Sequence, residues 1–174
     1  LDKVIRGIRN KIVSSNYMIK SKKNVAHHYD LSDKLYDLFL DKDRQYSCAY
    51  FNSPNDTLEQ AQQNKLELIA KKLLLEKDQN VLDIGSGWGG MAAYLSKRSN
   101  VNVKGVTLSE EQIAYSKQRK IDDSLDQVQY ELQDYRKVRE KYDRIVSVGM
   151  FEHVGTAHYQ EFFNKVYDLL NQKG

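Results

Sequence analysis

The sequence is poor in cysteine and proline: its 174 residues include only Cys48 and Pro54. A single cysteine cannot form a disulfide within the chain, and the spacing typical of a cysteine metal site is missing. No apolar run approaches the ~20 residues that a membrane-spanning helix needs. Arg6, Arg9 and Lys11 interrupt the only early apolar pattern, so we expect no signal peptide. These absences favour a globular domain in a reducing, intracellular compartment.

The four histidines do not form a pattern typical of a metal site. His27 and His28 are adjacent and would point to different sides of any regular element. His153 and His158 miss the i,i+4 spacing that places two ligands on one helix face. We therefore expect no bound metal.

Positive charge is concentrated at the N-terminus. Residues 1–23 contain seven Lys or Arg and one acid, Asp2, whereas the remaining residues sum to −3. Apolar residues at helical spacing predict a basic amphipathic helix here: Leu1, Val4, Ile5, Ile8 and Ile12. Such a helix could pack on the domain, or contact an anionic membrane, where each basic residue contributes about 1 kcal/mol. No nucleic-acid partner is expected, because no basic–aromatic array accompanies the charge.

Beyond residue 57, short apolar runs alternate with amphipathic helical patterns. This alternation predicts an α/β domain with a parallel, doubly wound, Rossmann-like sheet and right-handed crossovers. We divide the chain into an N-terminal helical and aromatic-rich cap, residues 1–56, and a Rossmann-like core, residues 57–174. The expected strands are 81–84, 101–106, 127–132 and 142–148, and the expected helices are 31–40, 58–76, 90–98, 109–119 and 158–170.

The helix expected at 58–76 has a clear start. Pro54 lies in a turn-forming loop, and Thr57 with Gln60 forms the pattern of a capping box. Its expected buried face consists of Leu58, Ala61, Leu66, Ile69, Ala70, Leu73 and Leu74.

A glycine-rich loop follows the first expected strand. Ligands of doubly wound sheets bind beyond the carboxyl ends of the strands, and glycine lets the backbone approach a ligand without a Cβ in the way. Gly85-x-Gly87-x-x-Gly90 matches the dinucleotide fingerprint, while Gly85-x-Gly87-x-Gly89 matches methyltransferases that bind S-adenosylmethionine. The glycines alone leave both cofactors open.

An acid is missing where NAD would need one. The dinucleotide fingerprint expects a carboxylate about 20 residues on, at the tip of the second strand. Here that tip is 105–108, and the first carboxylate is Glu110. Asp83, just before the glycines, is typical of many methyltransferases and would favour the cationic end of S-adenosylmethionine, or simply order the loop. The loop therefore favours S-adenosylmethionine, and a nicotinamide-dependent oxidoreductase is the weaker alternative.

Five segments stand in one order along the chain: His28-Tyr29-Asp30, residues 46–51 (YSCAYF), 81–90 (VLDIGSGWGG), 105–112 (GVTLSEEQ) and 143–155 (DRIVSVGMFEHVG). Together they resemble the cyclopropane fatty acid synthase and mycolic acid cyclopropane synthase family, in which Thr-Leu-Ser-x-x-Gln replaces the acid beside the cofactor. The resemblance implies a class I methyltransferase fold. It also implies that the last strands of the sheet would follow Gly174, so we expect this segment alone to bind the cofactor weakly and to turn over no lipid.

The resemblance also implies a set of cofactor contacts. Asp134, after the third strand, would accept a hydrogen bond from the adenine amino group, although a solvated loop acid is the alternative. Ser86 stands where the family often has cysteine. The full set is Tyr46, Ser47, Asp83, Gly85, Ser86, Gly87, Trp88, Gly89, Thr107, Leu108, Gln112, Gln133, Asp134 and Tyr135.

In the family, the sulfonium methyl group moves onto a cis double bond of an acyl chain, and loss of a proton closes a cyclopropane. Bicarbonate near the reacting carbon accepts that proton. Carried over here, Cys48 and Glu152 would help form the bicarbonate pocket. The residues alone also allow Cys48 to be a small buried hydrophobe and Glu152 to be an acid stabilised at a helix N-terminus.

The implied partners are unsaturated phospholipid acyl chains and an anionic membrane surface. We expect a cytoplasmic protein, peripheral to the inner face of the membrane, and a homodimer is compatible with the resemblance. Two alternatives stay open. One is another S-adenosylmethionine-dependent lipid or amine methyltransferase, and the other is a non-catalytic, membrane-binding fragment.

Overall fold

The computed structural model describes residues 33–174, so the predicted basic helix and the segment His28-Tyr29-Asp30 lie outside the described residues. Within the described part, four parallel strands form a sheet in the order β3-β2-β1-β4. The strands are β1 (Asn80–Ile84), β2 (Asn102–Thr107), β3 (Val128–Leu132) and β4 (Arg144–Val146).

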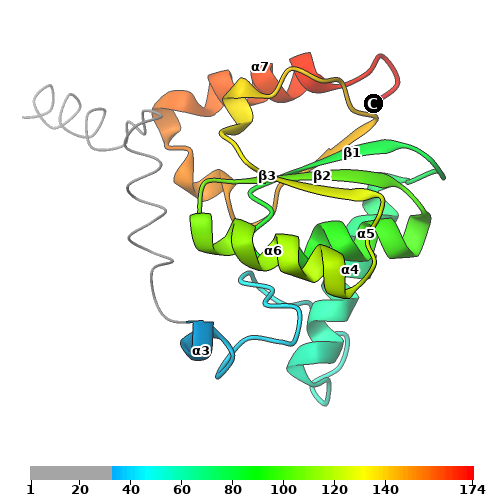
Figure 1. The fold of residues 1–174 in the computed structure, drawn as a ribbon, viewed down its shortest axis with the longest axis vertical. Coiled ribbons are helices and arrows are strands. Elements are labelled where there is room, and N and C mark those ends of the chain that lie inside the picture. Colours follow the sequence, from blue (N-terminus) through cyan, green and yellow to red (C-terminus); the bar gives the residue numbers. More distant parts are fainter. Residues whose placement is uncertain (1–32) are drawn as a thin grey trace, which may run out of the picture.

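Helices cover both faces of this sheet (Figure 1). On one face lie α4 (Leu58–Leu73), α5 (Gly90–Ser99) and α6 (Glu110–Asp122), and on the other lies α7 (Tyr159–Leu169). This arrangement confirms the predicted doubly wound α/β fold. The shorter helices are α3 (Asp33–Tyr36) and the single 3₁₀ turns η1 (Tyr135–Lys137), η2 (Phe151–His153) and η3 (Thr156–His158).

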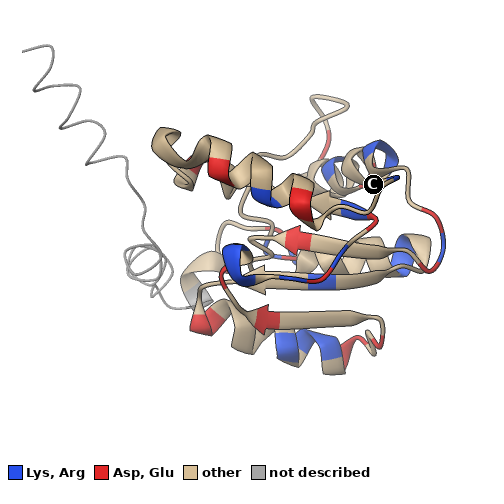
Figure 2. Ribbon diagram, turned by 90° about the horizontal axis from the view of Figure 1, so that it is seen from above, with Lys and Arg blue, Asp and Glu red and all other residues tan. Residues whose placement is uncertain are grey.

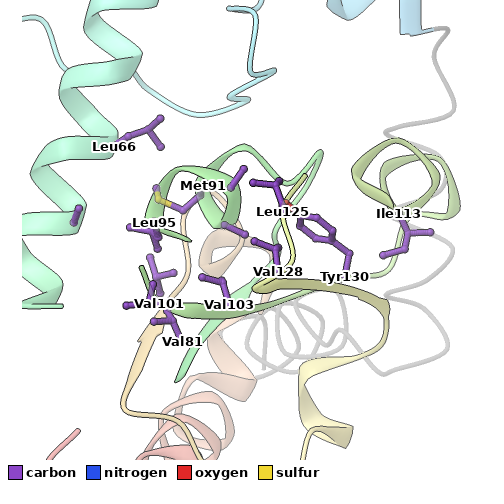
Figure 3. Close-up of a cluster of buried hydrophobic side chains, with 14 residues drawn as sticks. Leu66, Val81, Met91, Leu95, Val101, Val103, Ile113, Leu125, Val128 and Tyr130 are labelled. Atoms are coloured by element: carbon purple, nitrogen blue, oxygen red, sulfur yellow. The ribbon is translucent and has the colours of Figure 1, made fainter. Parts of the chain in front are cut away.

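The first hydrophobic cluster fills the space between the sheet and α4, α5 and α6. Leu66 of α4 and Leu95 of α5 pack there with Val81 and Val103 of the sheet (Figure 3). All four side chains are almost completely buried.

Strand alternation supplies the second cluster on the opposite face, because successive side chains point to opposite sides of a sheet. Leu82 and Ile84 of β1 pack there with Phe162 and Leu169 of α7. Asp83, between them, therefore shares the face of Val81.

The predicted start of α4 is confirmed, and its predicted end is corrected. The capping box is present: the Thr57 side chain accepts from the Gln60 amide, and the Gln60 side chain accepts from the Thr57 amide. The helix ends at Leu73, and Leu74 caps it in a left-handed conformation (φ 49°). Leu74 thereby leaves the helical periodicity and is 73% exposed, so its assignment to the buried face is wrong.

Two other elements are shorter than expected. The helix predicted over 31–40 contains only α3 within the described residues, and turns follow it from residue 37. β4 spans three residues instead of 142–148. It is an edge strand of the described sheet and pairs with Val81–Asp83 of β1. Before it, Tyr142 forms a bridge to Leu170 instead, and after it the backbone turns at Gly149, which has φ +70°.

Acidic and basic residues are interspersed along the described helices (Figure 2). Several pair across elements, such as Lys97 with Asp123 at 2.9 Å and Lys104 with Glu140 at 2.9 Å. The Lys97–Asp123 pair is exposed on both sides, and such pairs contribute little to stability. No helix in the described part of the chain combines the length and apolar character needed to cross a membrane.

Candidate functional site

The strand order creates a switch point beside β1. β2 and β3 lie on one side of β1 and β4 lies on the other, so the connections after β1 and β4 diverge at the carboxyl edge of the sheet. Ligands of doubly wound sheets bind at this position. A pocket lies there, lined by residues from five segments: 44–47, 83–91, 106–112, 133–136 and 148–158.

The pocket brings together thirteen of the fourteen residues predicted to contact the cofactor. The exception is Gly89, which caps the N-terminus of α5. Cys48 and Glu152 are exposed and lie outside the lining, although their neighbours Ser47 and His153 belong to it. Their roles at a bicarbonate pocket stay predictions.

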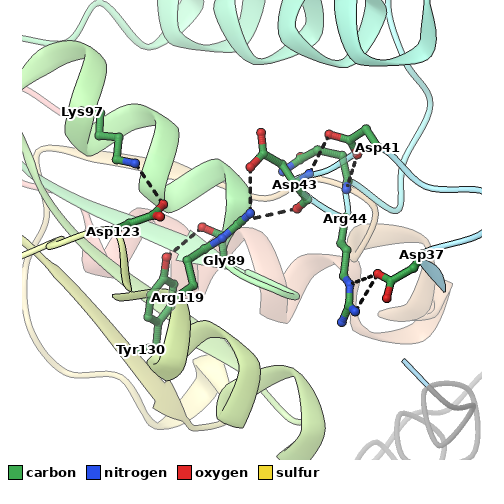
Figure 4. Close-up of polar contacts among 10 residues, drawn as sticks. Asp37, Asp41, Asp43, Arg44, Gly89, Lys97, Arg119, Asp123 and Tyr130 are labelled. Carbon is green, nitrogen blue, oxygen red and sulfur yellow. Dashed lines mark hydrogen bonds and ion pairs between the residues drawn. The ribbon is translucent and has the colours of Figure 1, made fainter. Parts of the chain in front are cut away.

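Two glycines of the loop after β1 occupy positions where no side chain fits. Gly89 has φ +84°, and a Cβ there would lie 2.6 Å from the Tyr130 hydroxyl oxygen, which donates to the Gly89 carbonyl at 2.8 Å (Figure 4). Gly85 has φ +82°, and its Cβ would lie 2.7 Å from Cβ of Met150. The loop thus packs closely against β3 and against the segment after β4.

The end of β2 presents an amide where NAD-binding proteins present an acid. The buried Thr107 hydroxyl donates to Gln112 Oε1 at 2.8 Å. This bond turns Oε1 toward Thr107, and the amide nitrogen, which is a donor, lies 3.9 Å from the position of a Cβ on Gly87. Ser109 caps α6 by accepting from the Gln112 backbone amide at 3.2 Å, which holds Gln112 in place.

Three buried polar atoms of the lining have no hydrogen-bond partner within the described residues: Asp83 Oδ2, Ser86 Oγ and Gln133 Oε1. Such atoms are costly to bury unless a ligand or water satisfies them. Burial raises the pKa of Asp83 to about 7, from a usual value near 3.8. A cation at this edge of the sheet would satisfy Asp83 and restore its charge.

Asp134 forms an ion pair with Arg136, and both residues line the pocket. Its carboxylate accepts from Arg136 Nη2 at 2.6 Å and from Arg136 Nε at 2.9 Å, and both side chains are largely buried. The Arg136 backbone amide adds a third bond to Asp134 at 3.0 Å. Asp134 is therefore an ordered carboxylate of the lining and not a solvated loop acid.

The lining segment 44–47 is fixed by α4 and by its own turn. Gln62 Nε2 donates to the Gln45 carbonyl at 3.1 Å and to the Ser47 carbonyl at 3.0 Å. Lys65 Nζ donates to Ser47 Oγ at 2.7 Å. Asp41 Oδ1 accepts from the Gln45 amide at 2.7 Å.

A second anchor ties this segment to α6 (Figure 4). Arg119 pairs with Asp43 at 2.7 Å, and Arg44 pairs with Asp37 at 2.7 Å while lying 4.2 Å from the centre of the Tyr115 ring. Arg44 lines the pocket together with Gln45. Sequence reasoning missed both residues, and the only signal for them was their place directly before Tyr46.

Aromatic rings cover the glycine loop on the same side. Trp88 is 3% exposed, and its ring centre lies 4.7 Å from that of Tyr36 and 6.4 Å from that of Tyr46. Tyr36 and Tyr46 from the N-terminal segment therefore pack with Trp88 of the glycine loop in one aromatic cluster.

The segment after β4 supplies lining residues that sequence reasoning also missed, including Met150, His153 and His158. His158 Nδ1 lies 2.9 Å from Glu161 of α7. The available signal was positional, because these residues follow an apolar strand at the same edge of the sheet. In the part of the chain that the structure describes, no group of three or more metal-ligating side chains gathers.

A comparison with protein families matches residues 17–174 to the model described as mycolic acid cyclopropane synthetase. The cyclopropane-fatty-acyl-phospholipid synthase of Escherichia coli K12 is 46% identical over 162 residues, which cover 91% of this chain and 41% of that enzyme. The probable fatty acid methyltransferase of Pseudomonas putida is 41% identical over 153 residues, which cover 86% of this chain and 39% of that protein. The chain thus spans about two-fifths of the length of these curated relatives.

A solved structure agrees with these matches. Mycolic acid cyclopropane synthase CmaA1, complexed with SAH and CTAB, superposes with a TM-score of 0.84 at 39% identity. The match covers 87% of this chain and 53% of that structure.

Proposed function

The chain belongs to the mycolic acid cyclopropane synthetase family, and on that premise we propose that it forms the cofactor-binding part of an S-adenosylmethionine-dependent lipid methyltransferase. The proposed reaction transfers the methyl group to a cis double bond of a membrane-lipid acyl chain and closes a cyclopropane ring. Family membership agrees with the resemblance of the five sequence segments.

The observation that carries this proposal is the pocket at the switch point, with its three unsatisfied polar atoms. S-adenosylmethionine fits this chemistry because it has a cationic end, a ribose and an adenine. Asp83 matches the cationic end. The amide of Gln112 and Oε1 of Gln133 offer one donor and one acceptor, and Gly87, which has no side chain, allows close backbone approach.

Each group of the chain has a separate task in this proposal. Asp83 ionises against the cationic end, and Gln112 donates to the ribose hydroxyls, as its free amide proton allows. Asp134 accepts from the adenine amino group, which requires it to exchange part of its bonding to Arg136. Trp88 and Tyr46 exclude water from the reacting end.

When bound, the cofactor would supply an electrophilic methyl group on its sulfonium sulfur. An alkene is a poor nucleophile, so the protein contributes proximity and a dry setting rather than a strong base. Aromatic faces such as those of Tyr46 and Trp88 would stabilise a carbocation on the acyl chain. Bicarbonate would serve as proton acceptor, with Cys48 and Glu152 near its pocket by family resemblance.

The test is the product formed from the full-length enzyme of which this chain is proposed to be the cofactor-binding part, with S-adenosylmethionine and vesicles of a cis-unsaturated phosphatidylglycerol; the 174 residues alone should form none. We expect a lipid that has gained one CH₂ and lost its double bond, measured by mass spectrometry with and without ozonolysis. Lys72→Met, an exposed change on α4, serves as a control that keeps the activity. A lipid that contains the added CH₂ but keeps its double bond would contradict ring closure.

A second candidate is methyl transfer to lipid without ring closure. The relative from Pseudomonas putida, named a probable fatty acid methyltransferase, favours it. The ozonolysis arm separates the two products. An amine acceptor remains a further alternative, and labelled methyl on the headgroup would identify it. The nicotinamide alternative is tested by calorimetry with S-adenosylhomocysteine and NADH, since only the first should bind.

We also propose that the protein works at the cytoplasmic face of the membrane as a peripheral protein. The support is the excess of Lys and Arg within residues 1–23, which lie outside the described residues. Sedimentation with neutral and anionic vesicles tests it, because binding indifferent to lipid charge would remove the support. A homodimer stays a prediction, to be measured by analytical ultracentrifugation.

A further inference from the structure

A buried lysine lies directly behind the pocket, on α4. Lys65 is 6% exposed, and its Nζ donates to Ser47 Oγ at 2.7 Å and to Gln45 Oε1 at 3.3 Å. A buried ammonium is costly unless it is compensated. The negative charge that most favours the ammonium is that of Asp41. The Asp41 carboxylate oxygens, however, already accept from the Gln45 and Asp43 amides. Burial lowers the pKa of Lys65 to about 8, so the ammonium is incompletely compensated.

The direction of the hydrogen bond decides what Ser47 can offer. An ammonium can only donate, so Ser47 Oγ must accept from Lys65. The hydroxyl has one proton, and that proton is left for an acceptor other than Lys65. Donation by a cation also polarises the hydroxyl and strengthens it as a donor.

The place of Ser47 shows where such an acceptor would lie. Ser47 lines the pocket, and a Cβ on Gly149, in the loop after β4, would be 3.6 Å from the Ser47 Cβ. Gln62 holds the carbonyls on both sides of Tyr46, at 3.0 Å and 3.1 Å, so the hydroxyl is presented by a fixed backbone.

We propose that Lys65 is a positioning residue that turns the Ser47 hydroxyl into a donor for the carboxylate of the cofactor's amino-acid tail. This rests on the proposed function, since it assumes that S-adenosylmethionine occupies the pocket. The tail carries both charges: Asp83 matches its cationic end, and the Lys65–Ser47 pair matches its anionic end. Lys65 itself does not touch the ligand.

The test compares S-adenosylhomocysteine with its decarboxylated analogue, which keeps the adenosine and the amine but lacks the carboxylate. Calorimetry is performed on the wild type, Ser47→Ala, Lys65→Met, the double variant and the exposed control Lys72→Met. For S-adenosylhomocysteine, Ser47→Ala and Lys65→Met should each weaken binding by about ten- to one-hundred-fold, as for loss of a hydrogen bond to a charged group. Binding of the decarboxylated analogue should change less than about two-fold, and Lys72→Met should change neither.

The double variant should bind S-adenosylhomocysteine no more weakly than Ser47→Ala alone, because the two residues act through one bond. Equal losses for both ligands would overturn the proposal and leave Lys65 as a tether between α4 and the cap. Additive losses would also overturn it. If Lys65→Met does not fold, Lys65→Gln, which removes the charge but keeps a polar side chain, takes its place in the comparison of the two ligands. A wild type that binds neither ligand would instead refute the proposed function.

Discussion

Replacing Asp83 with asparagine should change how the stability of the unliganded protein depends on pH. Asp83 is 2% exposed, and its Oδ2 has no partner within the described residues. Burial raises its pKa in the folded protein to about 7, whereas the unfolded value is near 3.8. The folded state therefore holds this proton more tightly, and stability is lost as pH rises from the unfolded value to the folded one.

The size of the effect follows from that difference in pKa. One pKa unit corresponds to about 1.4 kcal/mol, so the full ionisation cost has an upper limit of about 4 kcal/mol. About 3 kcal/mol of it should develop between about pH 5 and 8. An asparagine side chain has nearly the same shape as that of Asp83 and does not titrate, so the variant lacks this slope.

The assay is urea unfolding of both proteins at several pH values in that window. We expect the free energy of unfolding of Asp83→Asn, minus that of the wild type, to rise with pH by up to about 3 kcal/mol. The difference isolates Asp83 from every other titrating group. A difference that stays flat would show that Asp83 ionises in the fold as it does in water. Saturating S-adenosylmethionine should flatten the wild-type slope, since a cation beside Asp83 lowers its pKa.

Three further substitutions test the core, the start of α4 and the glycine loop, which together position the site. Leu66→Ala, in the core beneath α4, should lower the free energy of unfolding by about 2–5 kcal/mol in urea titrations, and a loss below about 1 kcal/mol would show that the cluster is loosely packed. Thr57→Ala removes the capping box and should cost about 0.5–2 kcal/mol by thermal unfolding, whereas Thr57→Ser should recover most of it. Gly89→Ala should destabilise the protein by more than about 1 kcal/mol and weaken S-adenosylhomocysteine binding in calorimetry, because φ is +84° and Tyr130 occupies the Cβ position. Unchanged binding by this variant would mean that the loop tolerates a side chain.

The sequence by itself determined the fold class and predicted thirteen of the residues that line the pocket. The short apolar run at Val81–Ile84 and the 3.6-residue period of the helices are local features of the sequence, so they can be recognised without a structure. The loop after β1 was predictable for the same reason: Gly85 and Gly89 adopt backbone conformations that favour glycine.

Only the tertiary structure decided which side chains converge on the pocket from distant parts of the chain. Lys65 and Gln62 belong to a helix whose apolar stripe predicted a plain core face, yet they are buried because the segment 44–47 lies across α4 and offers acceptors. Leu74, in contrast, was predicted to be buried and is exposed, because its left-handed conformation at the end of α4 takes it out of the helical periodicity. The periodicity of a helix indicates which side chains are buried, but not which residues they contact. A buried lysine is stable only where the fold supplies hydrogen-bond acceptors, and these come from a distant part of the chain.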